Sequence, residues 1–242
     1  MTRDADLSIC PKLLPVEAGY QHISIGDLHG NAIKLLYTLI EEGFLELGEE
    51  NYNELYNIYS KDPNKLTKAD INKFRSILAF SKFNNNKSLT LIGDELSDRG
   101  MNDWFTLLIL KRLHEAKVDV DILISNHGVD FIHKINNQES CIGILPGGKS
   151  PTRSYDNMIT LVRNGIISEE EIKEIITEHY IPMFKALNYS ISDKGEFIIY
   201  SHAPIGLETV EEIAKRLYMG LHCLEESEPR PLGSLVLKIS TP

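Results

Sequence analysis

The chain has 242 residues, of which 42% are hydrophobic and 25% are charged, and its formal net charge at pH 7 is −10. These proportions are typical of a globular protein with enough residues for one well-packed domain. An excess of acidic residues disfavours binding to nucleic acid or to an anionic membrane surface, because like charges repel. No apolar run approaches the ~20 residues of a membrane span, and the N-terminus has no apolar signal sequence, so we expect a cytoplasmic protein.

Four apolar runs predict strands, and each ends in a polar loop that contains glycine: residues 22–25, 88–92, 118–124 and 196–200. Three of these loops lead into segments with helical periodicity, at residues 32–45, 102–116 and 208–220. Asn31 is placed to cap the first helix, and Asn102 or Asp103 the second. Repeated strand–loop–helix units predict an α/β fold, in which functional side chains gather on loops beyond the strand ends.

Two stretches depart from this strand–loop–helix pattern. Residues 46–87 are polar, rich in asparagine and lysine, and predicted to be helical in pieces. Residues 136–190 begin as a glycine-containing loop and continue into a helix, where Ser168 and Glu171 have the spacing of a capping box. We expect both stretches to be insertions into a single domain that spans residues 1–242.

Polar side chains with metal-binding or catalytic chemistry follow all four predicted strands: Asp27 and His29, then Asp94, Asp98 and Arg99, then Asn126 and His127, and finally His202. Side chains alternate along an extended strand, so Asp27 and His29 are predicted to point the same way. Carboxylate oxygen and imidazole nitrogen together suit a divalent first-row metal. One such pair is more often a structural hydrogen bond, but four equivalent strand ends together favour a single functional site.

The segments GDLHGN (26–31), GDELSDRG (93–100), SNHGVD (125–130) and YSHAPIG (200–206) resemble the successive motifs of the phosphoprotein-phosphatase family of metallophosphoesterases. That family includes Ser/Thr protein phosphatases and symmetrical diadenosine tetraphosphate hydrolases. The two insertions resemble those of its bacterial effector variants. The resemblance implies a sandwich of two β-sheets flanked by helices, with metal ions at the strand ends.

The resemblance also implies a centre for two divalent metal ions, with manganese expected and iron or zinc as alternatives. Asp27 and His29 would hold the first ion, Asp94 would bridge both ions, and Asn126 and His202 would hold the second. A hydroxide that bridges the ions would attack phosphorus directly, so no phosphoenzyme is needed. The sequence agrees with this, because none of its three cysteines has an arginine six residues later, as thiol-dependent phosphatases do.

The same motifs imply roles for three further residues. Arg99 would bind the phosphate as a bidentate donor. His127 would protonate the leaving oxygen, and Asp98 would orient its imidazole. The expected substrate is a phosphorylated protein, with phosphoserine and phosphothreonine favoured and phosphotyrosine as an alternative.

The chain departs from the family pattern at three places. Three residues separate Asp94 from Asp98 where the family has two, so either a bulge absorbs the extra residue or Asp98 is displaced from His127. Ser125 and Gly128 stand where the family has glycine and an acid. A last metal-binding histidine is missing after His202, which leads us to expect a natural chain that continues beyond Pro242.

Three alternatives remain open. The chain could be a dinucleoside polyphosphate hydrolase or another small-molecule phosphoesterase. It could be a pseudophosphatase that binds a phosphoprotein without turnover. Residues 143–150, GILPGGKS, match the P-loop pattern of nucleotide-binding proteins, but a polar preceding segment and Pro151 argue against a P-loop. If the protein is a secreted effector, its expected location is the host cytosol.

Overall fold

The computed structural model describes residues 5–14, 22–136, 152–191 and 197–206, together with residues 208, 209, 211, 212 and 215. The chain divides into two compact units, Met1–Lys185 and Ala186–Pro242. Each unit is described by itself. Among the described residues, no helix combines the length and the apolar character needed to cross a bilayer.

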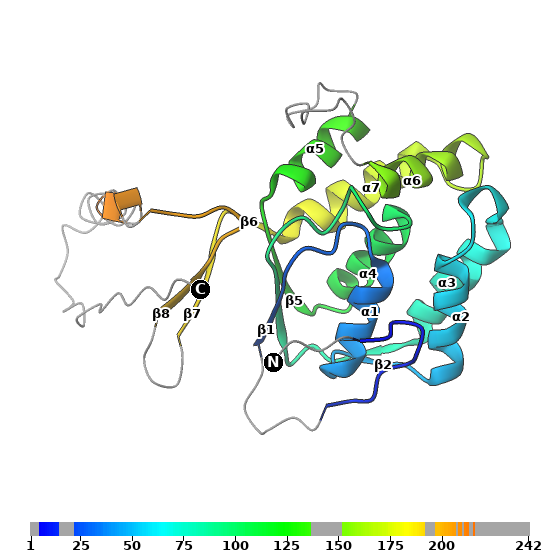
Figure 1. The fold of residues 1–242 in the computed structure, drawn as a ribbon, viewed down its shortest axis with the longest axis horizontal. Helices are drawn as coiled ribbons and strands as arrows, with labels where there is room; N and C mark the ends of the chain where they lie inside the picture. Colours follow the sequence, from blue (N-terminus) through cyan, green and yellow to red (C-terminus); the bar gives the residue numbers. More distant parts are fainter. Residues whose placement is uncertain are drawn as a thin grey trace. The chain divides into compact units, whose positions relative to one another are not determined.

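The first unit is built on a four-stranded sheet with the order β1-β4-β5-β6 (Figure 1). Its strands are β1 (His22–Ile25), β4 (Ser88–Leu91), β5 (Asp119–Leu123) and β6 (Phe184–Lys185). Each neighbouring pair is parallel, and His22 in β1 aligns with Ser88 in β4. The prediction of an α/β fold is confirmed, and three of the four predicted strands are β1, β4 and β5.

Helices α1 (Ala32–Glu41) and α4 (Asp103–Glu115) lie together on one side of this sheet (Figure 1). Nine of the 13 residues of α4 are buried, including Trp104 and Phe105. A helix that is apolar on nearly all sides needs cover on nearly all sides. The outer helices provide it, since each of them contacts α4: α3 (Lys68–Phe80), α6 (Arg153–Arg163) and α7 (Glu169–Ile175).

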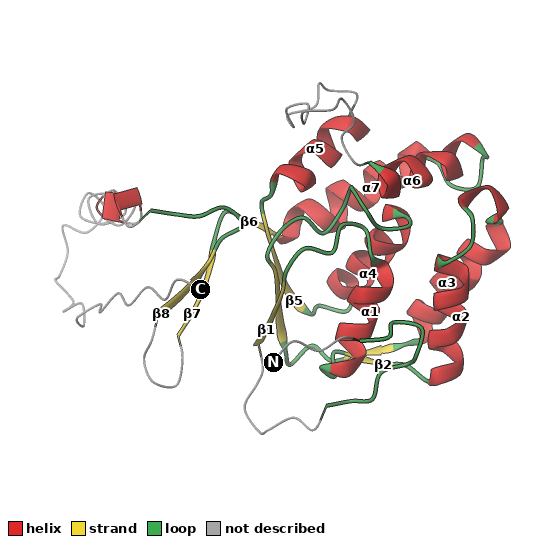
Figure 2. Cartoon of the chain, in the orientation of Figure 1, coloured by secondary structure: helices red, strands yellow, loops and turns green. Residues whose placement is uncertain are grey.

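The described parts of the segments predicted as insertions are largely helical, as Figure 2 shows. Residues 46–87 contain α2 (Glu49–Tyr59), a 3-10 turn (Pro63–Lys65) and α3 (Lys68–Phe80), which are flanked by the paired strands β2 (Leu45–Glu46) and β3 (Lys82–Phe83). The second segment contains α6 (Arg153–Arg163) and α7 (Glu169–Ile175), followed by a π-helical turn (Ile176–Tyr180) and a 3-10 turn (Ile181–Met183). Ser168 caps α7 and accepts a hydrogen bond from the Glu171 amide, as the sequence predicts.

The second unit contains the antiparallel pair β7 (Asn188–Ile191) and β8 (Phe197–Tyr200). The predicted fourth strand therefore exists as β8, but its hydrogen-bonded neighbour is β7 and not a strand of the four-stranded sheet. Within the first unit, the carboxyl ends of β1, β4 and β5 meet at one edge of the sheet, as expected. The two-sheet sandwich remains a prediction.

The loops that follow β1 and β4 are hydrogen-bonded to each other. The amides of Leu28 and His29 donate to the carbonyl of Asp94 at 3.1 and 2.8 Å, and the amide of Gly100 donates to the carbonyl of His29 at 2.6 Å. A Cβ on Gly100 would lie 2.2 Å from the carbonyl carbon of Gly30. Glycine at position 100 is therefore a steric requirement for this approach.

Helix α4 begins where the second of these loops ends. Asn102 is its N-cap, and the side chain accepts a hydrogen bond from the Trp104 amide at 3.0 Å. Asp103 instead turns into the protein, where its two carboxylate oxygens accept from the Ser97 amide at 3.0 and 3.1 Å. Burial is the main cause that raises the pKa of Asp103 to about 7, with the nearby Glu95 charge adding to it.

We predict that Gly100→Ala destabilises the protein by about 3 kcal/mol or more, because backbone atoms must move to admit the methyl group. The matched control is Gly48→Ala, since Gly48 is exposed and a Cβ there has no neighbour within 4 Å. Urea unfolding of the two variants measures the difference. Equal midpoints would show that the two loops separate without cost.

We also predict that the charge of Asp103 makes stability depend on pH. The folded-state pKa of about 7 exceeds the ordinary value of 3.8, so the folded protein holds this proton more tightly than the unfolded chain does. Its stabilising contribution is complete below the ordinary value and is lost as the pH rises through the folded value. Relative to Asp103→Asn, wild type should lose about 3 kcal/mol of unfolding free energy between pH 5 and pH 8. Urea unfolding at each pH tests this, and parallel profiles would contradict it.

Candidate metal centre and active site

Asp27, His29 and Asp94 come together where β1 and β4 end. Each offers one ligand atom, and these three atoms lie within 4.8 Å of one another. His29 and Asp94 are buried and Asp27 is exposed. This is the set that the sequence predicts for the first metal ion, drawn from two segments more than 60 residues apart.

Asp27 and His29 reach this arrangement through a turn and not as part of an extended strand. Strand β1 ends at Ile25, and His29 has a positive φ of 49°. The Nε2 atom of His29 nevertheless lies 3.5 Å from a carboxylate oxygen of Asp27. The predicted proximity is therefore correct, whereas the strand alternation from which it was predicted is wrong.

Backbone strain is concentrated in the same two loops. Five non-glycine residues in the described part of the chain have positive φ, and four of them are His29, Asp94, Ser97 and Asp98. Each such conformation costs roughly 1–3 kcal/mol and persists only where the surroundings enforce it. Backbone strain of this kind is characteristic of functional sites.

The surroundings of His29 fit a divalent metal ion. Neither of its buried ring nitrogens has a hydrogen-bond partner in the part of the chain that the structure describes. Both nitrogens nevertheless face carboxylates, with Asp27 near Nε2 at 3.5 Å and Asp98 near Nδ1 at 3.4 Å. Buried polar atoms are rarely left unsatisfied, and an imidazole surrounded by carboxylates is a donor set suited to first-row metals.

Asp98 keeps a place in the site despite the additional residue that precedes it. Positive φ values at Ser97 and Asp98, 56° and 107°, absorb the extra length. The ligand atoms of His29, Asp98 and His127 lie within 4.8 Å of one another, and the rings of the two histidines pack edge to face with centroids 5.4 Å apart. The extra residue therefore does not displace Asp98 from His127.

Asp98 also holds Arg99, whose Nε lies 3.0 Å from an Asp98 carboxylate oxygen. The Asp98 side chain is 7% exposed and that of Arg99 is 70% exposed. A buried carboxylate thus orients a guanidinium group that is itself open to solvent. This arrangement suits the predicted role of Arg99 in binding an anionic group of a substrate.

Asn126 and His127 form the first turn of a helix that the sequence prediction missed, α5 (Asn126–Ile135). Ser125 is its N-cap, and the hydroxyl accepts from the amides of Gly128 at 3.1 Å and Asp94 at 2.9 Å. Serine in place of the family's glycine therefore connects the third motif directly to the second. A serine followed by helical periodicity was the sequence signal for this helix.

Gly128, which stands where the family motif has an acid, lies against a buried pair of polar side chains. A Cβ at Gly128 would lie 3.1 Å from the Tyr180 hydroxyl and 3.3 Å from a Glu95 carboxylate oxygen. Tyr180 donates a hydrogen bond to Glu95. Burial, followed by the Glu95 charge, raises the pKa of Tyr180 well above its usual value, which keeps the phenol protonated as a donor. Sequence reasoning did not identify this pair.

The structure leaves two predicted ligands less defined. Asn126 is exposed at the start of α5, next to His127. His202 belongs to the second unit, so its role as a ligand remains a prediction. The P-loop match at residues 143–150 lies outside the described residues.

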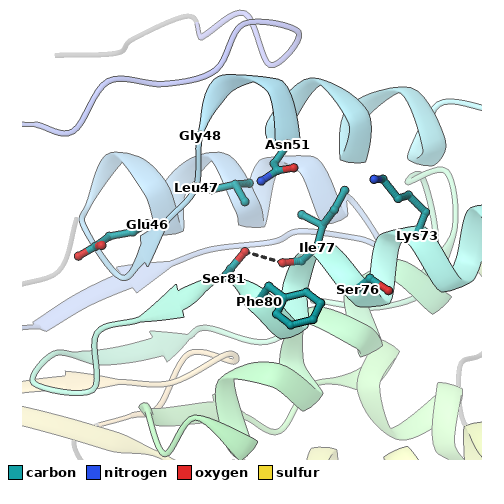
Figure 3. Close-up of a pocket in the computed structure, with 9 residues that line it drawn as sticks. All are labelled: Glu46, Leu47, Gly48, Asn51, Lys73, Ser76, Ile77, Phe80 and Ser81. Carbon is teal, nitrogen blue, oxygen red and sulfur yellow. Dashed lines mark hydrogen bonds between the residues drawn. The ribbon is translucent and has the colours of Figure 1, made fainter.

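A cavity of about 330 Å³ lies elsewhere on the first unit, between the β2–α2 connection and α3 (Figure 3). The residues that line it are Glu46, Leu47, Gly48, Asn51, Lys73, Ser76, Ile77, Phe80 and Ser81. None of them is a predicted site residue, so the cavity is separate from the candidate metal centre.

Comparisons with known proteins point to one family. The model of the family described as WipA-like, phosphatase domain, matches residues 88–239. Among solved structures, the crystal structure of the phosphatase domain from the Legionella effector WipB is similar, with a TM-score of 0.70 and 29% sequence identity over 83% of this chain and 73% of that chain. A search of curated proteins finds no match. Because the family match covers more than half of the 242 residues, the chain belongs to the family of WipA-like phosphatase domains.

Proposed function

We propose that the chain is a metal-dependent protein phosphatase that hydrolyses phosphomonoesters at the candidate metal centre. Membership of a phosphatase-domain family supports the reaction class. The observation that carries the metal dependence is the cluster of Asp27, His29 and Asp94, in which the buried His29 nitrogens face carboxylate oxygens and have no hydrogen-bond partner among the described residues.

The candidate ligands form two sets, one for each metal ion. Asp27, His29 and Asp94 would bind one divalent ion, and Asp94 with Asn126 and His202 would bind a second. Manganese is the proposed metal, with iron or zinc as alternatives. Such ions would supply Lewis acidity, which activates water and neutralises charge on phosphate oxygens.

Three side chains of the second and third motifs would bind the phosphate and assist the departure of the leaving oxygen. Arg99, exposed and held by Asp98, would bind the phosphate oxygens and fix the orientation of the ester. His127 would donate a proton to the departing oxygen. The Asp98 carboxylate, which lies within 4.8 Å of the ligand atoms of His29 and His127, would orient the His127 imidazole.

The proposed substrate is a phosphorylated protein, with phosphoserine or phosphothreonine favoured and phosphotyrosine as the alternative. The similar WipB domain comes from a Legionella effector. This supports the further proposal that the present chain is also a bacterial effector that acts in a host cytosol.

We predict manganese-dependent hydrolysis of p-nitrophenyl phosphate that Asp94→Asn lowers by on the order of 100-fold or more, because one carboxylate oxygen is lost from the ligand set. The matched control is Asp119→Asn. Asp119 is exposed at the amino end of β5, opposite the edge where the candidate site lies. Bound manganese, measured by elemental analysis, should fall in the first variant and not in the second. Absence of metal-dependent turnover in wild type would instead favour the pseudophosphatase alternative.

We predict that His127→Gln discriminates between leaving groups. Serine alkoxide requires a proton to depart, whereas nitrophenolate departs readily without one. The variant should therefore lose about 100-fold or more in kcat on a phosphoserine peptide and much less on p-nitrophenyl phosphate. The control is His133→Gln on the same helix.

Equal losses on the two substrates would contradict the general-acid role of His127. Turnover of diadenosine tetraphosphate without turnover of any phosphopeptide would assign the small-molecule alternative.

A further inference from the structure

The backbone of Met101, two residues after Arg99, is held on both sides by side chains from the two segments predicted as insertions. Its amide donates to the hydroxyl of Tyr59, in α2, at 2.9 Å. Its carbonyl accepts from the Nδ2 atom of Asn157, in α6, at 2.6 Å. The two peptide units that flank Met101, close to Arg99, are thus each fixed by a side chain from a different helix.

Tyr59 also connects the Met101 amide to the loop after β1. Its hydroxyl donates to the carbonyl of Gly30 at 2.8 Å while accepting from Met101. Gly30 directly follows His29, so a single hydroxyl joins the loops of the first and second motifs. Burial raises the pKa of Tyr59 to about 12, so the hydroxyl keeps its proton at neutral pH.

Helices α4 and α6 hold the same loop further upstream. The amide of Ser154, in the first turn of α6, donates to the carbonyl of Asp98 at 3.2 Å. Asp103 accepts from the amide of Ser97. Residues of α2, α4 and α6 therefore hold the backbone of this loop at positions 97, 98 and 101, on both sides of Arg99 in the sequence. Ser97 and Asp98 both have positive φ and would relax to other conformations without such contacts.

We propose that Tyr59 and Asn157 are positioning residues, which hold the loop of residues 97–101 in the conformation that presents Asp98 and Arg99 to the substrate. The inference rests on the proposed phosphatase function for its catalytic consequence. Neither residue touches the reacting atoms. The two predicted insertions would then be parts of the active-site framework, because each contributes one of the two side chains that hold Met101.

The test compares Tyr59→Phe with Tyr52→Phe in the full chain. Tyr52 is a matched control, since it is also buried in α2 and its hydroxyl also donates to a backbone carbonyl, that of Leu7 at 2.7 Å. Of these two tyrosines, Tyr59 hydrogen-bonds to the loops that follow β1 and β4, and Tyr52 hydrogen-bonds to Leu7. Both variants lose one hydroxyl, so a purely structural effect should appear in both.

The expected result is that Tyr59→Phe lowers kcat on a phosphopeptide by about 10- to 100-fold, as loss of buried hydrogen bonds predicts, while Tyr52→Phe stays near wild type. Amide hydrogen exchange of residues 97–101 should accelerate only in Tyr59→Phe. Asn157→Asp, which replaces the donor to Met101 by an acceptor, should give the same two changes. Asn53→Asp, at an exposed position of α2, should give neither.

Equal exchange of residues 97–101 in the Tyr59 and Tyr52 variants would overturn the proposal, and so would an unchanged kcat in Tyr59→Phe when wild type is active. Failure of the phosphatase assignment has a different signature, namely no manganese-dependent turnover in wild type and no effect of Asp94→Asn on manganese binding. Exchange of the loop does not depend on activity, so the two failures are distinguishable.

Discussion

The candidate site depends on the hydrogen bonds between the loops that follow β1 and β4. Parallel pairing of the two strands in register brings their carboxyl ends to the same edge, but it does not by itself place His29 beside Asp94. The amides of Leu28 and His29 do so by donating to the Asp94 carbonyl. This pairing requires Gly100 to lie against Gly30, where no side chain fits. The ligand cluster is therefore a consequence of backbone contacts more than of side-chain packing.

The strain of the site is offset by contacts outside it. Positive φ values at His29, Asp94, Ser97 and Asp98 are unfavourable conformations for residues with side chains. Hydrogen bonds to buried, well-packed elements compensate for them, notably the bond that the Asp94 amide donates to the cap hydroxyl of Ser125. Such an arrangement holds the side chains of the candidate metal centre in place before any ligand binds, which is a general requirement for electrostatic preorganisation.

Sequence reasoning predicted the strands and helix caps, because both depend on local sequence pattern. The strands around Ile25, Leu91 and Ile122 follow from apolar runs between polar loops, and the caps at Asn31 and Ser168 follow from side-chain chemistry near the first helical turn. The clustering of Asp27, His29 and Asp94 followed from the parallel topology, because carboxyl ends of neighbouring strands meet at one edge.

The hydrogen-bonded pairs that sequence reasoning missed join segments that lie far apart in the sequence. Glu95 meets Tyr180 across 85 positions of sequence, and Tyr59 reaches Met101 across 42. No periodicity or spacing marks such pairs. Helix α5 was missed for a different reason, since Gly128 within its first turn is typical of a loop and disfavours a helix. There the Ser125 cap and the lack of room beside Tyr180 outweigh local propensity.

The charge distribution gives an independent physical reason to expect cations at the centre. The Asp27, Asp94 and Asp98 carboxylates gather around His29, and two of these three residues are buried. Arg99 is paired with Asp98. Carboxylates that are brought together away from water repel one another, and a nearby positive charge lowers this free-energy cost. Divalent ions would neutralise this repulsion, so their binding should favour the folded arrangement of both loops. The same acidic cluster that is unfavourable for the chain alone would thus become a source of affinity for the proposed metal ions, and the strained loops that create it would be the structural basis of that affinity.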